Sequence, residues 1–393
     1  MDLQNRIKEI AQSIYPEIIE IRRHIHAHPE LSFEEFETSA FICSVLDKWN
    51  ISYKAGIAGT GIVAILHGAK PGKTIAFRAD IDALPITEKN IIPYKSLNEG
   101  KMHACGHDVH TSSLLGAISI LNTLKDEWEG TIKFIFQPGE EKIPGGASLM
   151  LKENALLPDE PEIIIAQHVF PDMESGNVGF RSGQYMASSD EIYITVIGKG
   201  GHAALPDKLI DPVFISAHLI TSLQQIVSRN AKPGLPTVLS FGKVEAAGAV
   251  NVIPDQVRIE GTFRTMNEEW RSKAHELIQK ITNELCSSMG GKAEIEIRRG
   301  YPVLVNNPEV TGKAKNFAIE YLGASKVHDL DIRMTAEDFA YFAQRYPSTL
   351  FRLGTSDPGK QSSALHTSTF NVNEKSVELS TGLLAYLAIS FLK

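Results

Sequence analysis

The sequence predicts an α/β protein in which a large domain is interrupted by a smaller α+β domain. Strand and helix patterns alternate over the first part of the chain, which is typical of a sheet with helices on both faces. The order then changes to β-α-β-β-α-β, which is the order of a ferredoxin-like unit. We therefore predict that 1–183 and 301–393 form one discontinuous domain around a mixed sheet, and that 184–300 form the inserted domain.

The first part of the large domain opens with an amphipathic helix. Its apolar stripe, at helical spacing, consists of Ile7, Ile10, Ile14, Ile18 and Ile21. Short apolar runs bounded by turn residues predict the strands, and longer apolar segments predict the helices. The predicted helices are 3–26, 34–49, 109–124 and 146–153, and the predicted strands are 61–67, 74–79, 131–136 and 162–167.

The inserted domain opens with a strand whose apolar and polar residues alternate along SDEIYITVIG. Its predicted strands are 189–198, 237–244, 255–263 and 293–299, and its predicted helices are 211–229 and 268–289. The large domain then resumes with helices at 308–322, 336–344 and 374–391 and a strand at 349–354.

The composition limits the function classes. The chain has 393 residues, with 39 Lys and Arg against 47 Asp and Glu, and the net charge of −8 argues against a nucleic-acid partner. No apolar run reaches the roughly 18 residues of a membrane span, and the N-terminus does not resemble a signal peptide. Three cysteines cannot form a disulfide framework. We therefore expect a cytoplasmic protein with no membrane partner.

The stretch MHACGHDVH at 102–110 is the strongest chemical signal. It combines His103, Cys105, His107, Asp108 and His110 just before a predicted helix. Thiolate and imidazole are the ligands that zinc-like ions prefer. The alternative is an ordinary helix start with Asp108 as its cap. So many ligand-capable side chains together favour metal binding.

Further polar residues follow predicted strands, where open α/β sheets place their sites. Glu140 and Glu141 can have different roles, because one can bind a metal while the other acts as general base. Alone, this pair is more typical of a solvated acidic loop. His168 follows another predicted strand, and His366 lies in a loop rich in Ser and Thr before the last helix.

Two acids, Asp80 and Asp82, follow the strand at 74–79. Buried acids are costly unless they are paired or bound to a metal. The alternative for both is a turn cap with an ion pair to Arg78.

Together these segments supply five ligand-type side chains, more than the about three that one catalytic zinc uses. They suit two divalent ions with a shared ligand, an arrangement that polarises a carbonyl and supports hydrolysis. The five candidates are Cys105, His107, Glu141, His168 and His366.

Over nearly its whole length the chain resembles the M20 metallopeptidases. Within them it is similar to the amidohydrolase branch, which includes hippurate hydrolases, N-acyl-amino-acid deacylases and auxin-conjugate hydrolases. The motifs that carry the resemblance follow the family's order: HPELSFEE (28–35), TGIVA (60–64), RADIDALP (78–85), HACGHDVH (103–110), QPGEE (137–141), GGHAALP (200–206), GTFRT (261–265), TAEDF (335–339) and LHTSTF (365–370).

The resemblance implies roles for residues of the large domain. The five candidates match the metal ligands, with Cys105 at the shared position. Glu140 matches the general base, which takes a proton from the attacking water and passes it to the leaving amine. Asp82 matches the Asp that orients a metal-binding His such as His107, but Asp80 occupies that motif's His position. The division of roles between Asp80 and Asp82 therefore stays open.

The resemblance also implies roles for the inserted domain, as a lid and dimerisation domain. His202 matches a residue that stabilises the oxyanion, often from the partner subunit. Asn251 and Arg264 match residues that bind the substrate's carboxylate, which the fork of an arginine can do with two hydrogen bonds. The ordinary alternatives are a surface loop for His202 and a cross-strand ion pair for Arg264.

The implied activity is hydrolysis of N-acyl-amino acids, at two divalent ions that could be zinc, manganese, cobalt or nickel. A dipeptidase or carboxypeptidase with the same centre is the first alternative. A metal-binding protein without catalysis is the second, and the presence of Glu140 argues against it. The resemblance also implies a homodimer formed through the inserted domain. Gly139 stands where the branch commonly has Ala, which loosens that turn without changing a functional group.

Overall fold

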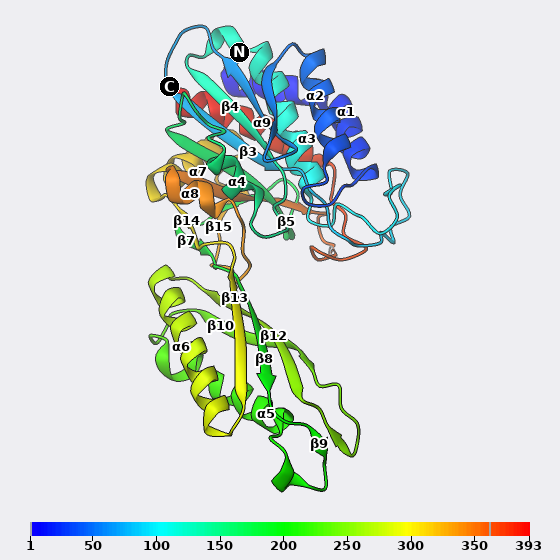
Figure 1. Ribbon diagram of the computed structural model, residues 1–393. Helices are drawn as coiled ribbons and strands as arrows, with labels where there is room; N and C mark the ends of the chain where they lie inside the picture. Colours follow the sequence, from blue (N-terminus) through cyan, green and yellow to red (C-terminus); the bar gives the residue numbers. More distant parts are fainter. Residues whose placement is uncertain (1, 361–362) are drawn as a thin grey trace. The chain divides into compact units, whose positions relative to one another are not determined.

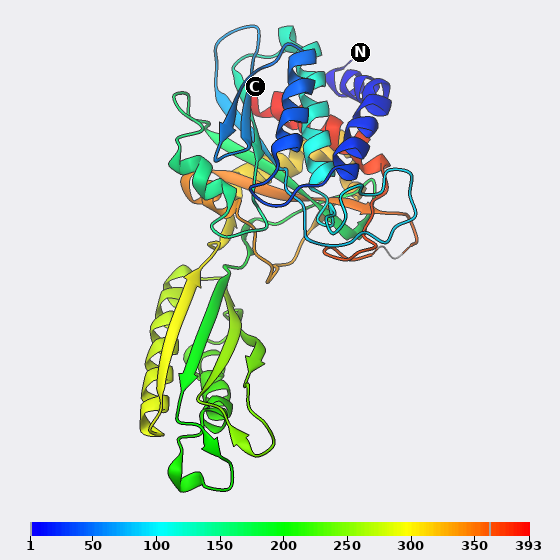
Figure 2. The same ribbon diagram turned by 45° about the vertical axis from the view of Figure 1, so that its right-hand side comes forward.

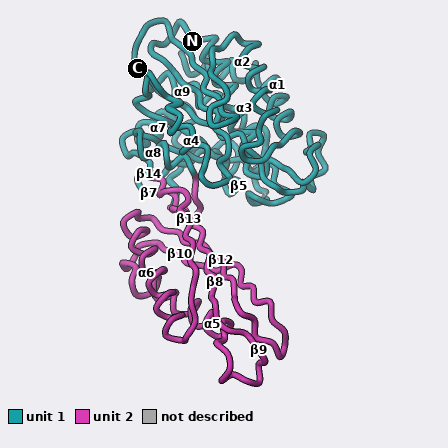
Figure 3. Tube along the Cα trace, in the orientation of Figure 1, with its two compact units in different colours: residues 1–185, 305–331, 338–393 teal, residues 186–304, 332–337 magenta. Residues whose placement is uncertain are grey.

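The protein divides into two compact units (Figure 3). The computed structural model describes residues 2–360 and 363–393. Unit 1 contains Met1–Tyr185, Val305–Asp331 and Asp338–Lys393, and unit 2 contains Met186–Leu304 and Ile332–Glu337. The sequence prediction of 184–300 for the inserted part does not include the short segment Ile332–Glu337.

The sheet of unit 1 has eight strands in the order β1-β2-β4-β3-β5-β16-β6-β15. Figure 1 labels β3, β4, β5 and β15 of this sheet. The strands β4, β3, β5 and β16 run parallel, whereas β1, β2 and β6 pair with antiparallel neighbours. The sheet is therefore mixed, as the sequence predicts. Its strands are β1 Ser52–Ile57, β2 Gly61–His67, β3 Thr74–Asp80, β4 Thr131–Gln137, β5 Ile163–Glu174, β6 Val178–Phe180, β15 Val327–Asp329 and β16 Ser348–Ser356.

Helices cover both faces of this sheet (Figure 2). In β4, Ile132, Phe134 and Phe136 point into the main hydrophobic core, which they share with α1, α3 and α9. Successive side chains of a strand point to opposite faces, so Lys133 points the other way, and its Nζ donates to the carbonyl of Leu156 just beyond α4. The helices are α1 Leu3–Ala27, α2 Phe36–Lys48, α3 His107–Thr123, α4 Gly146–Lys152, α7 Pro308–Leu322, α8 Ala340–Arg345 and α9 Lys375–Leu392.

Helix α9 is the only helix among the described residues whose length and composition resemble those of a membrane span. By length and composition alone it could cross a membrane, because its 18 residues have a mean hydropathy of 1.2. However, 61% of this segment is buried inside the protein, where it packs against α1 and α3. Its apolar character is that of a core helix.

Unit 2 is a ferredoxin-like α+β unit. Its antiparallel sheet has the order β10-β12-β8-β13, and α5 and α6 pack on it. The buried residues of β8, Ile192, Ile194 and Val196, share a core with Ile215 of α5 and Ile278 of α6. The elements are β8 Asp190–Ile197, α5 Pro212–Leu223, β10 Thr237–Glu245, β12 Gln256–Thr265, α6 Glu268–Ser288 and β13 Lys292–Arg299.

Several elements differ from the sequence prediction. The helix predicted at 211–229 ends at Leu223, and a π-helical turn follows at Ile226–Asn230. Strand β5 extends to Glu174, so His168 lies within the strand rather than after it. Short strands without an apolar run were not predicted: β1, β6, β15, β7 Gly183–Met186 with β14 Leu304–Asn306, and β9 Gly201–His202 with β11 Val252–Ile253.

Candidate metal centre

The predicted polar residues of unit 1 gather at one edge of its sheet. Parallel strands place their carboxyl ends at the same edge, which brings together segments far apart in the sequence. Asp80 ends β3, Glu140 and Glu141 follow β4, and His168 lies on β5. The N-terminus of α3 adds Cys105 and His107, and the loop after β16 adds His366.

Cys105 lies at the centre of this cluster. Its Sγ is 3.5 Å from Nε2 of His168 and 3.4 Å from Nε2 of His366. The Nε2 of His366 is also 3.2 Å from Oε1 of Glu141. Two sets of ligand atoms, each within 4.8 Å of one another, therefore share Cys105: one with His107 and His168, the other with Glu141 and His366. Two ions with a shared thiolate would need such an arrangement.

The tautomers of the histidines fit a metal. The Nδ1 of His107 is 2.8 Å from the carbonyl oxygen of Asp82, and Nδ1 of His168 is 2.8 Å from the carbonyl oxygen of Val169. A carbonyl can only accept, so each Nδ1 carries the proton and each Nε2 offers a lone pair. The Nε2 of His107 is buried and has no hydrogen-bond partner among the described residues. A divalent ion would provide a partner for this nitrogen.

The electrostatics also fit a cation. Burial and the nearby charges of Glu141 and Glu140 raise the pKa of Cys105 well above its ordinary value. Burial lowers the pKa of His107, but the charge of Asp80 and its contacts with Asp82 outweigh burial and raise it to about 10. Without a metal, these negative charges favour the protonated forms of Cys105 and His107, and a divalent ion would replace those protons.

The structure separates the roles of Asp80 and Asp82. Asp82 Oδ1 is 3.2 Å from Nδ1 of His107, and its Oδ2 accepts from the backbone N–H of Glu141 at 2.9 Å and from Ser32 Oγ at 2.6 Å. Asp80 instead pairs with Arg78 at 2.6 Å. Asp82 is therefore the carboxylate that holds two candidate ligand segments.

Two residues of the HACGHDVH motif are already engaged elsewhere. His110 donates from Nδ1 to Asp80, and its Nε2 accepts from the N–H of Val169 at 2.9 Å, so no ring nitrogen remains for a metal. Asp108 does not cap α3, because it lies in the first turn and binds Arg22 and His26, both at 2.9 Å. The helix-cap alternative for Asp108 is therefore wrong.

His366 is held in an unusual backbone conformation. Its φ of +60° lies in the left-handed region, which is uncommon for a residue other than glycine. Its N–H donates to the carbonyl of Ala104 at 2.9 Å, so the loop after β16 is tied to the segment that carries Cys105. This contact holds the His366 ring beside Cys105 and Glu141.

Asp338 is a member of this neighbourhood that the sequence did not single out. It lies in the TAEDF motif, is fully buried and accepts from Arg78 Nη2 at 3.0 Å and from Gln137 Nε2 at 2.8 Å. Its other oxygen accepts from the N–H of Ala147 at the start of α4. The TAEDF motif drew attention to this segment, but nothing in the sequence shows that Asp338 contacts β3 and β4.

In unit 2, His202 and Asn251 lie next to each other. His202 on β9 pairs with Val252 of β11, and the N–H of Ala203 donates to the carbonyl of Asn251 at 3.0 Å. Both residues are exposed. They therefore form one small polar surface that other molecules can reach.

Arg264 lies elsewhere in unit 2, on β12. Its Nη1 is buried without a hydrogen-bond partner in the part of the chain that the structure describes, and burial lowers its pKa. The described residues make no ion pair with it, so the cross-strand alternative is wrong. A guanidinium with an unsatisfied N–H is suited to bind an anion such as a carboxylate.

Arg264 and His202 lie at opposite ends of the sheet of unit 2. Residue 263 of β12 pairs with Asp190 at the start of β8, and Gln256 pairs with Ile197 at its end. His202 and Asn251 belong to the second end, where the N–H of Gly200 bonds Asp255. Eight residues of strand separate the two ends, a distance of about 25 Å.

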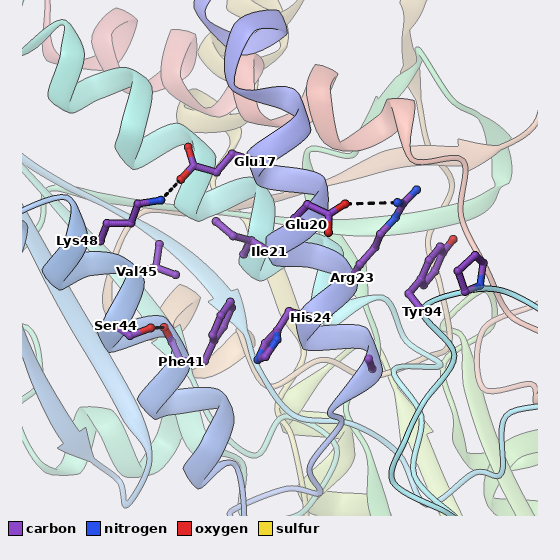
Figure 4. Close-up of a pocket in the computed structure, with 12 residues that line it drawn as sticks. Glu17, Glu20, Ile21, Arg23, His24, Phe41, Ser44, Val45, Lys48 and Tyr94 are labelled. Atoms are coloured by element: carbon purple, nitrogen blue, oxygen red, sulfur yellow. Dashed lines mark hydrogen bonds and ion pairs between the residues drawn. The ribbon is translucent and has the colours of Figure 1, made fainter.

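A groove outside this cluster lies between α1 and α2 and has a volume of about 710 Å³ (Figure 4). His24 stacks on Phe41 in it, with ring centroids 3.9 Å apart. Charges on its walls pair with one another, as Lys48 does with Glu17 at 2.7 Å. The groove contains none of the predicted site residues.

Comparisons with known proteins identify the family of the chain. The chain matches Peptidase family M20/M25/M40 over residues 76–390. It is 40% identical to N-acetyl-L-cysteine deacetylase of Bacillus subtilis (86% of this chain, 80% of the relative) and 37% identical to thermostable carboxypeptidase 1 of Saccharolobus solfataricus (100% and 99%). A solved Bacillus subtilis structure, described as a dinuclear metal binding peptidase, is 32% identical with a TM-score of 0.81 (97% and 99%). The chain belongs to peptidase family M20/M25/M40.

Proposed function

We propose that the protein hydrolyses the amide bond of N-acyl-amino acids to a carboxylic acid and a free amino acid. Family membership makes it a metallo-amidohydrolase. The observation that supports metal-assisted hydrolysis is the pair of ligand sets that share Cys105, with Glu140 beside them. The substrate class is that of relatives named N-acetyl-L-cysteine deacetylase and N-acyl-L-amino acid amidohydrolase. An acid, a shared thiolate and three histidines at one sheet edge are suited to amide hydrolysis.

Two divalent ions would be held by Cys105, His107, Glu141, His168 and His366, with Cys105 shared between them. Zinc, manganese, cobalt and nickel all fit sulfur, nitrogen and oxygen ligands. When bound, the ions polarise the amide carbonyl and lower the pKa of water.

The protein's own residues move the proton and hold the geometry. Glu140 is buried, and His107, Glu140 and Glu141 present ligand atoms within 4.8 Å of one another. Glu140 accepts a proton from the attacking water, whose oxygen adds to the amide carbon. The carbon–nitrogen bond then breaks, and Glu140 delivers the proton to the leaving amine. Asp82 keeps the Nδ1 proton of His107 in place.

Arg264 and Asn251 bind the substrate's carboxylate, and His202 stabilises the oxyanion. The distance of about 25 Å between the two ends of unit 2 means that one copy cannot bring Arg264 and the His202–Asn251 pair to one small substrate. We therefore propose a homodimer through unit 2 in which these residues come from different copies. Exposed apolar side chains support an interface there: Val213, Phe214, Val244 and Val250.

The cytoplasm is the proposed location. All three cysteines are free, which suits a reducing compartment.

A peptidase that acts on dipeptides or on the carboxyl terminus of peptides is the second candidate. Relatives at 37% identity are named thermostable carboxypeptidases, and both substrate classes present an amide next to a carboxylate.

A release assay with purified protein tests the proposal. The panel contains N-acetyl-, N-benzoyl- and indole-acyl-amino acids and several dipeptides, each with and without chelator. We expect release of the amino acid from the acylated substrates that stops when chelator is added. Preference for dipeptides would favour the peptidase, and no release from any substrate by metal-loaded protein would favour a non-catalytic metal-binding protein.

A further inference from the structure

Glu35 is a fully buried carboxylate beneath the turn that carries Glu140 and Glu141. Its Oε1 accepts hydrogen bonds from the N–H of Gly139 and of Phe33, both at 2.8 Å. Its Oε2 accepts from the hydroxyl of Thr60 at 2.6 Å. The first of these bonds joins two segments that are 104 residues apart in the chain.

The charge of Glu35 is not balanced by a cation. Other buried acids pair with arginine, as Asp80 does with Arg78, Asp108 with Arg22 and Asp190 with Arg271. Glu35 makes no ion pair with any described residue, and burial together with the charge of Asp82 raises its pKa. A buried acid without a cation is destabilising, so its hydrogen bonds must offset that cost or serve another purpose.

The turn at 137–141 is fixed by backbone contacts on either side of Glu140. Before it, the N–H of Gly139 bonds Glu35, and after it, the N–H of Glu141 bonds Asp82. Gly139 has a φ of +60°, and a Cβ at this position would lie 2.4 Å from the ring of Phe33. Segment 33–35 therefore shapes the turn both sterically and by hydrogen bonding.

We propose that Glu35 is a positioning residue that fixes the backbone of Gly139, so that Glu140 and Glu141 both lie at the metal centre. The inference rests on the proposed function, because Glu140 is its general base and Glu141 one of its ligands. Loss of the Gly139 contact shifts Glu140 and Glu141 together. Both turnover and metal retention therefore depend on Glu35.

Two substitutions of Glu35 separate this role from simple packing. Glu35→Met fills a similar volume but accepts no hydrogen bond, and we expect it to lower kcat by about 10–100-fold with little change in KM. We expect it to lose metal to a chelator about tenfold faster. In Glu35→Gln, the amide oxygen can accept from Gly139 and Phe33, and the NH₂ group can donate to Thr60. This variant should stay within about threefold of the wild type in both measurements.

Glu30→Met is the matched control. The Glu30 carboxylate lies in the same segment and accepts from Thr38 N at 2.8 Å and from Thr38 Oγ1 at 2.9 Å. It makes no hydrogen bond with the described residues of the turn. We expect a lower melting temperature, with kcat and metal loss unchanged.

Equal kcat and equal metal loss in Glu35→Met and Glu30→Met would overturn the proposal, as would a Glu35→Gln variant as impaired as Glu35→Met. If Glu35→Met does not fold, Thr60→Val replaces it, because it removes one bond to Glu35 at nearly constant shape. We then expect a fall in kcat of about two- to fivefold with KM unchanged, and an unchanged kcat would contradict the role. A wild-type protein inactive on every acylated substrate would contradict the proposed function instead, while the metal-loss comparison would still test Glu35.

Discussion

The candidate residues of unit 1 and those of unit 2 are held in different ways. In unit 1 His107 and Glu141 are fixed by Asp82, and His366 by the backbone of Ala104. In unit 2 His202 lies on a two-stranded ribbon of only four residues, Asn251 directly precedes its second strand, and both are exposed. The first group is held by hydrogen bonds between segments of unit 1 around the buried His107, whereas the His202–Asn251 pair lies on an accessible surface.

This difference indicates what each region contributes. A network of buried polar groups holds its geometry because each member has a partner, and removal of one partner affects the others. An exposed side chain has few contacts to lose, so its substitution changes catalysis and leaves the fold intact. Substitutions of the candidate site residues of unit 1 should therefore affect metal binding or stability as well as activity, with one exception.

That exception is Glu140, which gives the largest expected effect. Glu140→Gln removes the general base but keeps the shape of the side chain, so we expect kcat to fall by about 10³-fold or more. Metal content per chain, measured by elemental analysis on the same sample, should stay near the wild-type value. Nearly normal turnover would contradict the assignment of Glu140.

His202→Ala should lower kcat by about 10²–10³-fold, the effect of removing one oxyanion donor. Metal content and melting temperature should not change, because His202 is exposed. Mixing this variant with Glu140→Gln tests the dimer, since a mixed dimer has one site with an intact Glu140 and the partner's intact His202. Recovered activity supports action between copies, and no recovery after confirmed subunit exchange would show that His202 acts within its own copy.

Asp82→Asn tests the network directly. The Asn amide has one oxygen, and its NH₂ group cannot accept, so the contacts to His107 and Glu141 cannot both persist. We expect metal affinity to fall by about 10–100-fold. Competition with a chromogenic chelator measures it, and Asp82→Asn with wild-type affinity would show that the backbone carbonyl of residue 82 is sufficient.

The smallest expected effect concerns stability against pH. Burial raises the pKa of Glu374, but hydrogen bonds from Arg23 and the charge of Arg22 outweigh burial and hold it below its ordinary value. A lowered pKa stabilises the fold above the unfolded-state value near 4.3, and this stabilisation is lost as the pH falls below about 4. Glu374→Gln should cost about 1 kcal/mol at pH 7.

Denaturant unfolding at pH 7, 5 and 3 measures this cost. The difference between Glu374→Gln and the wild type should shrink toward pH 3. A constant difference would show that the charge of Glu374 does not contribute.

Much of the fold could be predicted from the sequence, because its strands and helices have strong periodic patterns of apolar residues. The order β-α-β-β-α-β identified unit 2, and apolar runs identified β3, β4 and β5. Short strands such as β6 and β15 were missed because three residues carry no periodicity. The extent of β5 was also missed, because Gln167, His168 and Pro171 interrupt the apolar run that began the strand.

The ligand candidates were predicted for a different reason: residue types suited to metals occur together before one helix, after predicted strands and in the loop before the last helix. The residues that support these candidates could not be predicted from the sequence. Glu35 lies just before α2, and its sequence context is that of an ordinary acidic residue at a helix start. Only the fold brings its carboxylate to the N–H of Gly139. Asp80 and Asp82 could not be told apart, since their partners His110 and His107 lie on one helix turn whose rotation the sequence does not specify.

The most direct test of the central claim measures hydrolysis of an N-acyl-amino acid before and after removal of metal. Purified protein is stripped with a chelator, and Zn²⁺ or Mn²⁺ is then returned stepwise while release of the amino acid is followed. We predict that stripped protein is inactive and that activity returns in full at two equivalents of metal per chain. Full activity in protein shown by elemental analysis to hold no metal would contradict amide hydrolysis at the centre around Cys105.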